Sequence, residues 1–420
     1  MRVLFIPSNY PPAVGGLEIN VHNLAKHLKS LGHEVIVLTS KWWNWKLPSY
    51  EVIEGVPVHR TFFYVFRGSA KSFLAFLFCL PIALARTFLV IRRFKPDVVN
   101  LHFAGPNCFY LWLLRPWIKV PTIVTLHGTV EPPGLGPECL QSGYTATEAK
   151  IMNRVCMSML RHCSCVVGVS QKLADRAREV SPQDPKRFLV IRVGVDIPPR
   201  NDKSDYYGDY ALFIGRMVRE KGIDVLVKSL ALLPHQCDGL HVLIAGDGPE
   251  KPHLENLAKE LGVESRLTFL GMVDRPRIHE LLKGCRFLVV PSRSEGFGTV
   301  NVEALAHSKP VIASAVGGIP EIIRDMQTGL LVERDDPEAL ARALTALWSS
   351  PEQGRLMGER GRTLVEKEFS WESIAAKYVE LYEGLVVIGP PSPADIYPVS
   401  LVQVKDQKHN QELSNPRRVE

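Results

Sequence analysis

Two glutamates, Glu295 and Glu303, stand eight positions apart within the stretch SEGFGTVNVEALA at 294–306. Over eight helical residues their Cα atoms would lie roughly 12 Å apart along the axis. A glycosidase acid/base pair holds its carboxylates roughly 5–10 Å apart, so this spacing better suits two acceptors for different hydroxyls of one polyol ligand. No D-x-D motif or histidine cluster nearby indicates a metal pair. The alternative is two helix N-terminal carboxylates favoured by the helix dipole.

The loop around these glutamates has the composition of an anion site. A strand-like run ends at Pro291, and small residues lead to a helix that is expected to begin near Thr299. The first turn of a helix leaves backbone N–H groups unpaired and carries a partial positive charge, which favours a phosphate. Gly296 and Gly298 carry no side chains, so an anion can approach the backbone there.

Two cations follow the first strand that is expected in the second half of the chain. Arg216 lies at the end of that strand, and Lys221 precedes Gly222 at the entry to the next helix. Glu220 is the one acid nearby in the sequence. Two cations at one sheet edge suit a diphosphate, and solvated loop charges are the alternative.

A second glycine-containing helix entrance follows the first strand of the chain. Gly15 and Gly16 precede a helix that is expected to begin near Leu17, and such an entrance is compatible with phosphate. It is not the dinucleotide fingerprint G-x-G-x-x-G, whose nearest candidate, GDGPEK at 246–251, lacks the final glycine. NAD binding therefore has little support.

Two histidines also fall at the ends of expected strands. His127 ends the run TLH and precedes Gly128, and His102 ends the run VVNLH. Ligands of open parallel sheets bind at the carboxyl ends of strands, so both positions are candidates for a binding site. A structural role in the core is the alternative for each.

Two series of β-branched runs are expected to position these residues. Runs of five to seven residues that alternate with helices, such as 17–31 and 147–162, indicate βαβ units and a parallel sheet. The runs of the first half lie at 2–6, 34–39, 97–102, 122–128, 165–170 and 188–194. Those of the second half lie at 211–216, 240–246, 266–271, 285–292, 310–315 and 328–332.

A stretch rich in Pro, Asp and Tyr at 196–210 separates the two series and predicts an inter-domain linker. The sequence therefore predicts an α/β chain with two Rossmann-like domains whose strand ends face a shared cleft. The expected limits are 1–200 and 201–370, followed by a helix at 371–388 that could cross back to the first domain. A Pro-rich polar tail at 389–420 is expected to be flexible.

The apolar run at 72–91 allows three interpretations. It is near transmembrane length, but Pro81 and Arg86 interrupt it, and Arg92, Arg93 and Lys95 follow. A buried or partly buried helix of the first domain is one interpretation. A helix in a membrane interface with its basic flank on anionic lipid is the second, and a membrane span is the third.

Composition places the chain among ordinary globular proteins. It has 420 residues, 46% hydrophobic and 22% charged, with a net charge of +6. This mild excess fits anionic ligands or a membrane surface and does not indicate nucleic acid. The eight cysteines show no C-x-x-C pair, and no secretory signal is visible, so a reduced cytoplasmic setting is expected.

Taken together, the motifs resemble those of the retaining glycosyltransferases of family 4, which have the GT-B architecture. The resemblance covers roughly residues 1–385. It rests on G-G after the first strand, H-G after a later one, G-R-x4-K-G, G-D-G-P-E, and P-S-x-x-E-G-F-G-x-x-x-x-E-A-x-A-x-x-x-P-V-I-A-x-x-x-G-G-x-P-E.

The resemblance implies a role for each matching residue. Glu303 would bind the ribose hydroxyls of the donor, and Glu295 would lie near the transferred sugar. Arg216 and Lys221 would neutralise the diphosphate leaving group. The remaining expectations are backbone donors around Phe297, Gly298, Thr299 and Val300, a domain-one loop at Gly15 and Gly16 that closes on the phosphates, and His127 lining the acceptor side.

The implied activity is metal-independent transfer of a hexose or related sugar from a UDP or GDP sugar, with retention and without a cofactor. The acceptor is expected to be a glycan, a lipid-linked glycan or a small molecule, and association with the inner face of a membrane is a hypothesis. No nucleic-acid partner is expected. The alternatives are an enzyme like the nucleotide-sugar 2-epimerases and a non-catalytic partner subunit of the same fold.

Overall fold

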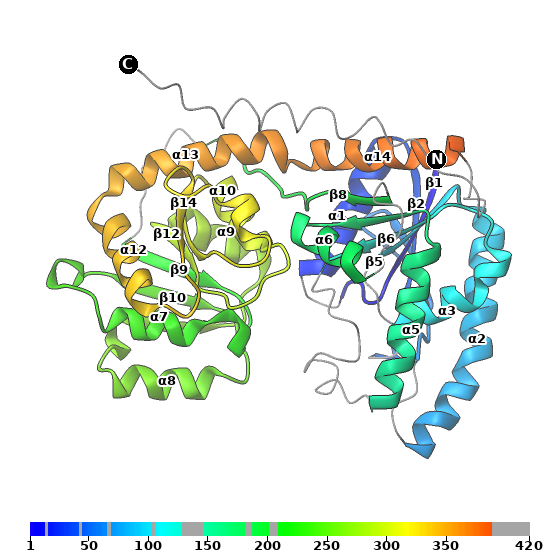
Figure 1. The fold of residues 1–420 in the computed structure, drawn as a ribbon, viewed down its shortest axis with the longest axis horizontal. Helices are drawn as coiled ribbons and strands as arrows, with labels where there is room; N and C mark the ends of the chain where they lie inside the picture. The colour runs from blue at the N-terminus through cyan, green and yellow to red at the C-terminus, as the bar shows by residue number, and fades with distance from the viewer. Residues whose placement is uncertain are drawn as a thin grey trace.

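Two parallel sheets, one in each half of the chain, form the framework of the protein (Figure 1). The structure is a computed structural model. It describes residues 1–12, 16–41, 44–64, 69–102, 106–127, 146–180, 187–200 and 209–388. Gly15, Gly128, most of the predicted linker and the predicted tail at 389–420 lie outside these ranges.

The first sheet has eight strands in the order β3-β4-β2-β1-β5-β6-β7-β8. All neighbours are parallel except the edge pair β3 and β4. The strands are β1 (Arg2–Pro7), β2 (Glu34–Ser40), β3 (Tyr50–Ile53), β4 (Val56–Thr61), β5 (Val98–His102), β6 (Thr122–Leu126), β7 (Cys165–Gly168) and β8 (Phe188–Val190).

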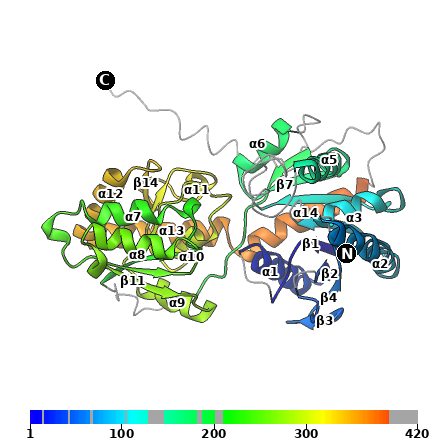
Figure 2. The same ribbon diagram turned by 90° about the horizontal axis from the view of Figure 1, so that it is seen from below.

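Helices cover both faces of this sheet, and the expected helices at 17–31 and 147–162 are confirmed as α1 and α5 (Figures 1 and 2). The helices of the first half are α1 (Gly16–Ser30), α2 (Ala70–Phe94), α3 (Pro106–Leu114), the 3-10 turn η1 (Arg115–Trp117), α5 (Ala146–His162) and α6 (Gln171–Val180).

The second sheet has six parallel strands in the order β11-β10-β9-β12-β13-β14. They are β9 (Tyr210–Ile214), β10 (His241–Ala245), β11 (Leu267–Gly271), β12 (Phe287–Val290), β13 (Val311–Ser314) and β14 (Gly329–Val332). Its helices are α7 (Ile223–Leu230), α8 (Lys251–Glu260), α9 (Arg275–Gly284), α10 (Thr299–Ala306), α11 (Ile319–Ile322), α12 (Pro337–Ser349) and α13 (Pro351–Glu368).

Both sheets are buried on both faces, which explains why their strands are continuous apolar runs rather than alternating ones. In β12, Phe287 and Val289 belong to the core on one face of the sheet, and Leu288 and Val290 belong to the core on the other. Each domain therefore has two hydrophobic cores, one on either side of its sheet.

The sequence analysis missed the antiparallel edge hairpin of β3 and β4. Glu54 and Gly55 form its two-residue turn, and both have positive φ values, of 44° and 81°. Two positive φ values are the geometry of a type I′ hairpin turn, for which Asn-Gly and Asp-Gly are the strong sequence signals. A Glu-Gly pair gives a weaker signal.

The last helix, α14 (Trp371–Ile388), packs on the first domain although α13 belongs to the second (Figures 1 and 2). Trp371, Tyr378 and Tyr382 are buried in the core that contains Val3 and Phe5 of β1. The Tyr382 hydroxyl accepts a hydrogen bond from Asn100 Nδ2 at 2.8 Å. The chain therefore connects the two domains twice.

The substitution Tyr382→Phe should lower the melting temperature by a few degrees, because it leaves the buried Asn100 amide without its acceptor. An unsatisfied buried donor costs about 1–3 kcal/mol. Thermal unfolding followed by circular dichroism measures the effect. Tyr50→Phe, at a tyrosine that is 53% exposed, is the matched control, and an equal shift in both variants would contradict the prediction.

Candidate functional site

The strand order of the second sheet reverses between β9 and β12, which are hydrogen-bonded neighbours although β10 and β11 lie between them in the sequence. Strand β9 pairs with β10 on one side and with β12 on the other. Open parallel sheets bind ligands in the crevice at such a switch point. Arg216 and Lys221 follow β9, and Glu295 follows β12, so the fold brings these three predicted site residues to one crevice.

Lys221 and Glu295 are in direct contact in this crevice. The Lys221 Nζ donates to Glu295 Oε2 at 2.5 Å, and both side chains are mostly buried. Arg216, by contrast, is exposed. The sequence assigned Lys221 and Glu295 to different parts of a ligand, whereas the structure shows that they form an ion pair with each other.

Close backbone packing fixes the turn that carries Lys221. Gly222 has a φ of 65°, and a Cβ atom there would lie 1.9 Å from the Pro291 carbonyl oxygen at the end of β12. Arg293 adds a second connection, since its Nη1 donates to the Arg219 carbonyl oxygen at 2.8 Å and to Asp224 at 2.7 Å. Arg293 and Asp224 were not among the predicted site residues.

Helix α10 begins where the sequence predicted, at Thr299, and Gly298 is its N-cap with a φ of 88°. The side chain of Phe297 is buried and lies 6.1 Å from the ring of Phe369. The ring is therefore part of the core, and only the backbone of this residue remains available to a ligand. Val300 is partly buried in the first turn of the helix.

Glu303 is buried inside α10, where its Oε1 accepts from Arg275 Nη1 at 2.7 Å. Arg275 is the first residue of α9, whose N-cap is Asp274. The sequence analysis missed Arg275, because nothing in the stretch VDRPR relates it to a glutamate 28 residues later.

Helix α1 of the first domain and helix α10 of the second approach each other. Asn20, in the first turns of α1, donates from Nδ2 to Thr299 Oγ1 in α10 at 3.5 Å. Gly16 is the first residue of α1. The N-terminal ends of α1 and α10 therefore lie on the same side of the junction, and both carry the partial positive charge of a helix dipole.

His102 and His127 form a pair at the carboxyl ends of β5 and β6, with His102 Nδ1 and His127 Nε2 3.1 Å apart. Both line a small cavity together with Asn20. Burial lowers the pKa of His127 to about 4. Burial and the neighbouring His127 lower the pKa of His102 well below its usual value, so both rings are neutral at pH 7.

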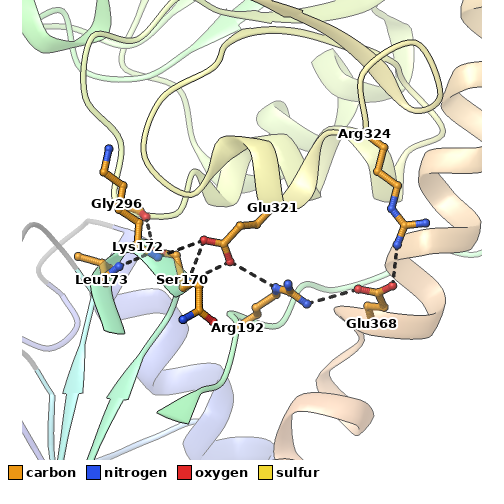
Figure 3. Close-up of polar contacts among 9 residues, drawn as sticks. Ser170, Lys172, Leu173, Arg192, Gly296, Glu321, Arg324 and Glu368 are labelled. Atoms are coloured by element: carbon orange, nitrogen blue, oxygen red, sulfur yellow. Dashed lines mark hydrogen bonds and ion pairs between the residues drawn. The ribbon is translucent and has the colours of Figure 1, made fainter. Parts of the chain in front are cut away.

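A polar junction between the domains lies next to the glutamate loop (Figure 3). The carboxylate of Glu321, in the second domain, accepts from the backbone N–H of Gln171 at 2.8 Å and of Lys172 at 3.4 Å in α6. Ser170 donates from its hydroxyl to the Gly296 carbonyl oxygen at 3.0 Å. The first turn of α6 is thus capped by a carboxylate from the other domain.

Arg192 extends this junction toward the second connection of the chain (Figure 3). Its guanidinium lies 3.8 Å from Glu321 and 3.4 Å from Glu368, and Glu368 also accepts from Arg324 at 3.0 Å. These contacts join the segment that follows β8 to α11 and α13 of the second domain.

A cavity of about 720 Å³ lies on the α6 side of the glutamate loop. It contacts the predicted site only at Glu295 and Gly296, and its other lining includes Lys172 and Arg176 of α6 and Arg334 of the second domain. The predicted donor residues therefore do not all line this cavity.

Comparison with known proteins identifies the family. The model of Glycosyltransferase Family 4 matches residues 14–198, and that of Glycosyl transferases group 1 matches residues 201–364. An uncharacterized glycosyltransferase of Methanocaldococcus jannaschii is 30% identical over 388 residues, which are 92% of this chain and 99% of the relative. The chain belongs to glycosyltransferase family 4 and is a retaining glycosyltransferase that uses nucleotide sugars.

Solved structures confirm the predicted GT-B fold. Sucrose-phosphate synthase from Thermosynechococcus elongatus superposes with a TM-score of 0.75 at 26% identity, over 92% of this chain and 99% of that one. HepE of Anabaena, solved in complex with UDP-glucose, superposes with a TM-score of 0.68 at 19% identity, over 92% of this chain and all of that one.

The substitution Glu321→Ala should loosen the domain junction, because it removes the cap of α6 and a partner of Arg192. Loss of a helix cap costs about 1 kcal/mol. The expected results are a lower melting temperature and a larger radius of gyration in small-angle scattering. Glu338→Ala is the control, since Glu338 lies in the first turn of α12 within one domain. An unchanged radius of gyration in Glu321→Ala would contradict the prediction.

Acid should destabilise the protein partly through His127. Its folded pKa lies below that of an unfolded histidine, so the unfolded state binds the proton more tightly and stability is lost as the pH falls from about 6.5 towards 4. We expect a loss of about 1–2 kcal/mol between pH 7 and pH 5. Urea unfolding at the two pH values should show a smaller loss in His127→Gln, and an equal loss would contradict this assignment.

Proposed function

We propose that the protein transfers a hexose from a UDP or GDP sugar, with retention, to a glycan, lipid-linked or small-molecule acceptor. The observation that carries this proposal is the meeting of Lys221, Glu295 and the N-terminal end of α10 at the switch point of the second sheet. A cation and a helix N-terminus at one crevice stabilise the negative charge that develops on a departing diphosphate.

The contact between Lys221 and Glu295 has a consequence for donor binding. A diphosphate in this crevice would compete with the Glu295 carboxylate for the Lys221 ammonium. Glu295 would then be available to accept hydrogen bonds from hydroxyls of the sugar. Arg216 is exposed at the same sheet edge and would supply a second cation.

Glu303 is positioned to accept from the ribose hydroxyls. Its contact with Arg275 holds one oxygen of this buried carboxylate and pairs it with a cation. The backbone N–H groups at Gly298, Thr299 and Val300 are in the first turn of α10, where such groups lack partners within the helix. They would bind phosphate or sugar oxygens.

In the transfer step, the bond from C1 of the sugar to the diphosphate oxygen breaks and a bond from C1 to the acceptor oxygen forms. The family resemblance implies that both occur on the same face of the sugar, with the acceptor proton passing to the leaving phosphate. The chain's own contribution is to neutralise the diphosphate, orient the sugar and exclude water when the domains close. Gly16 and His127 would face the donor from the first domain.

Neutral His127 suits this position, because an uncharged imidazole can hydrogen-bond a sugar hydroxyl without competing for the diphosphate. UDP is the first to test, since HepE, which shares the fold, was solved with UDP-glucose.

A thermal shift assay with UDP, GDP and ADP, with and without magnesium, tests the proposal. A nucleotide at about 100 times its dissociation constant should stabilise the protein by about 2.7 kcal/mol. The shift should occur with UDP or GDP, should not need magnesium, and should be lost in Arg216→Ala and Glu303→Ala. Arg219→Ala, at an exposed cation three residues from Arg216, is the matched control.

Two results would contradict the proposal. Absence of any shift would favour a partner subunit that retains the fold without binding a donor. Conversion of the nucleotide sugar to its epimer in the absence of acceptor would assign the site to the rival epimerase chemistry.

A further inference from the structure

Helix α2 is apolar on two faces, one packed on the first domain and one directed outward. Its packed face contains Ala83 and Val90, which are buried, and Leu84, which packs against the same core. Its outer face contains Leu74, which is 66% exposed, and Phe78, which is 72% exposed. A surface helix of a globular protein normally directs its apolar stripe to the core, so the outer face of α2 needs a different explanation.

This outer stripe is continuous along the helix. Its apolar members follow one another at helical spacing, and each is at least 44% exposed: Leu74, Leu77, Phe78, Ile82 and Leu89. The helix lies at the outer flank of the first domain, on the side away from the second domain (Figure 1). Together with Arg92 and Arg93 on the last turn of the same face, these residues are called the α2 face below.

The composition of α2 would also permit a membrane span. Within the described part of the chain, the segment Lys71–Phe94 alone is long and apolar enough to cross a membrane by length and composition, with a mean hydropathy of 2.3. Its packing argues against a span. The Phe76 ring lies 5.8 Å from that of Phe109, and Arg86 donates to the Ser49 carbonyl oxygen at 3.0 Å. One face of α2 is therefore an integral layer of the first domain.

The charge around the α2 face is strongly positive. Between residues 55 and 130 the one acidic residue is Asp97, and Arg2 binds it at 2.9 Å. In the described part of this stretch, the exposed lysines and arginines are Lys71, Arg92, Arg93, Lys95, Arg115 and Lys119. A surface that combines apolar side chains with this charge is complementary to a membrane of anionic lipids and not to a neutral apolar partner.

A cavity at the basic end of α2 is also lined by both apolar and basic side chains. It has a volume of about 420 Å³, and its lining includes Ile91, Lys95, Trp117 and Lys119. Trp117 is 63% exposed. Tryptophan is enriched where a protein meets the headgroup layer, and two lysines beside it suit a lipid phosphate.

We propose that the α2 face binds the surface of an anionic membrane, with α2 lying in the plane of the interface and its apolar side chains among the acyl chains. The cations at its carboxyl end and the cavity around Trp117 would contact lipid phosphates. This inference is independent of the sugar chemistry, because no residue of the donor site belongs to the α2 face. It would hold the cleft near acceptors that are carried by lipids.

Vesicle flotation with the full chain tests the proposal. We expect the protein to float with vesicles of phosphatidylcholine and phosphatidylglycerol, and to bind pure phosphatidylcholine far more weakly. Binding should fall as salt rises from 0.05 to 0.5 M, because surface charges are screened over a shorter distance. Washing with carbonate at high pH should release the protein, since an interfacial helix is peripheral.

Variants separate the apolar from the charged contribution. The double substitution Leu74→Glu and Phe78→Glu should weaken binding more than tenfold. Arg92→Gln with Arg93→Gln should weaken it about thirtyfold, from about 1 kcal/mol per cation near an anionic surface. The control is Leu232→Glu with Met272→Glu, at apolar residues that are 53% and 70% exposed on the second domain.

Several results would overturn the proposal: no flotation at low salt, an equal loss of binding in the control variant, or resistance to carbonate, which would indicate a span. Dimers in solution that the Leu74→Glu, Phe78→Glu variant abolishes would assign the face to self-association. Flotation that occurs only after removal of residues 389–420 would indicate that the chain's own tail occupies the α2 face. The nucleotide-induced thermal shift, measured on the same samples, distinguishes failure here from failure of the proposed function.

Discussion

The site depends on a close backbone contact between two loops of the second domain. A Cβ atom at Gly317 would lie 1.6 Å from the Glu295 carbonyl oxygen, and one at Gly318 would lie 2.8 Å from that of Gly296. Only glycine permits this approach. The contact fixes the loop that carries Glu295 and caps α10, and the same loop receives the Ser170 hydroxyl from the first domain. One constraint therefore shapes the donor site and the domain junction together.

Around this loop the functions are distributed between the domains. In the proposed function, the second domain would supply charge for a diphosphate and carboxylates for sugar and ribose, and the first would supply neutral histidines and the end of α1. The domains are joined by the segment after β8, which carries Arg192, and by α14, and Glu321 connects them beside the loop. On the opposite flank of the first domain, the α2 face would hold the protein at a membrane.

Much of this was predictable from the sequence. Continuous β-branched runs predicted both sheets, because strands buried on both faces must be apolar throughout. The start of α10 at Thr299 was predictable from glycines that precede an apolar helical run. The contacts of Lys221 with Glu295 and of Arg275 with Glu303 were not predictable from the sequence, because they join residues 74 and 28 positions apart. Such pairs depend on which strands become neighbours, and local patterns do not specify that.

The choice of which face of α2 is exposed is another feature that local sequence patterns do not specify. The sequence shows an apolar helix with a basic end, but only the packing shows which of its apolar side chains point outward. The Glu321 cap of α6 is also invisible in the sequence, because it links helices of different domains. Local sequence patterns thus predict the helices, the strands and the residues that could bind a ligand. Tertiary contacts determine which of those residues are already paired with one another.

We expect the nucleotide sugar to bind at the loop between β12 and α10. Hydrogen exchange with and without a saturating nucleotide sugar tests it most directly, because exchange reports protection peptide by peptide. The account predicts slower exchange in peptides that cover 215–222 and 293–303, with no change across α2. Protection confined to the cavity beside α6, at 172–179, or to regions outside both domains' strand ends would contradict the account.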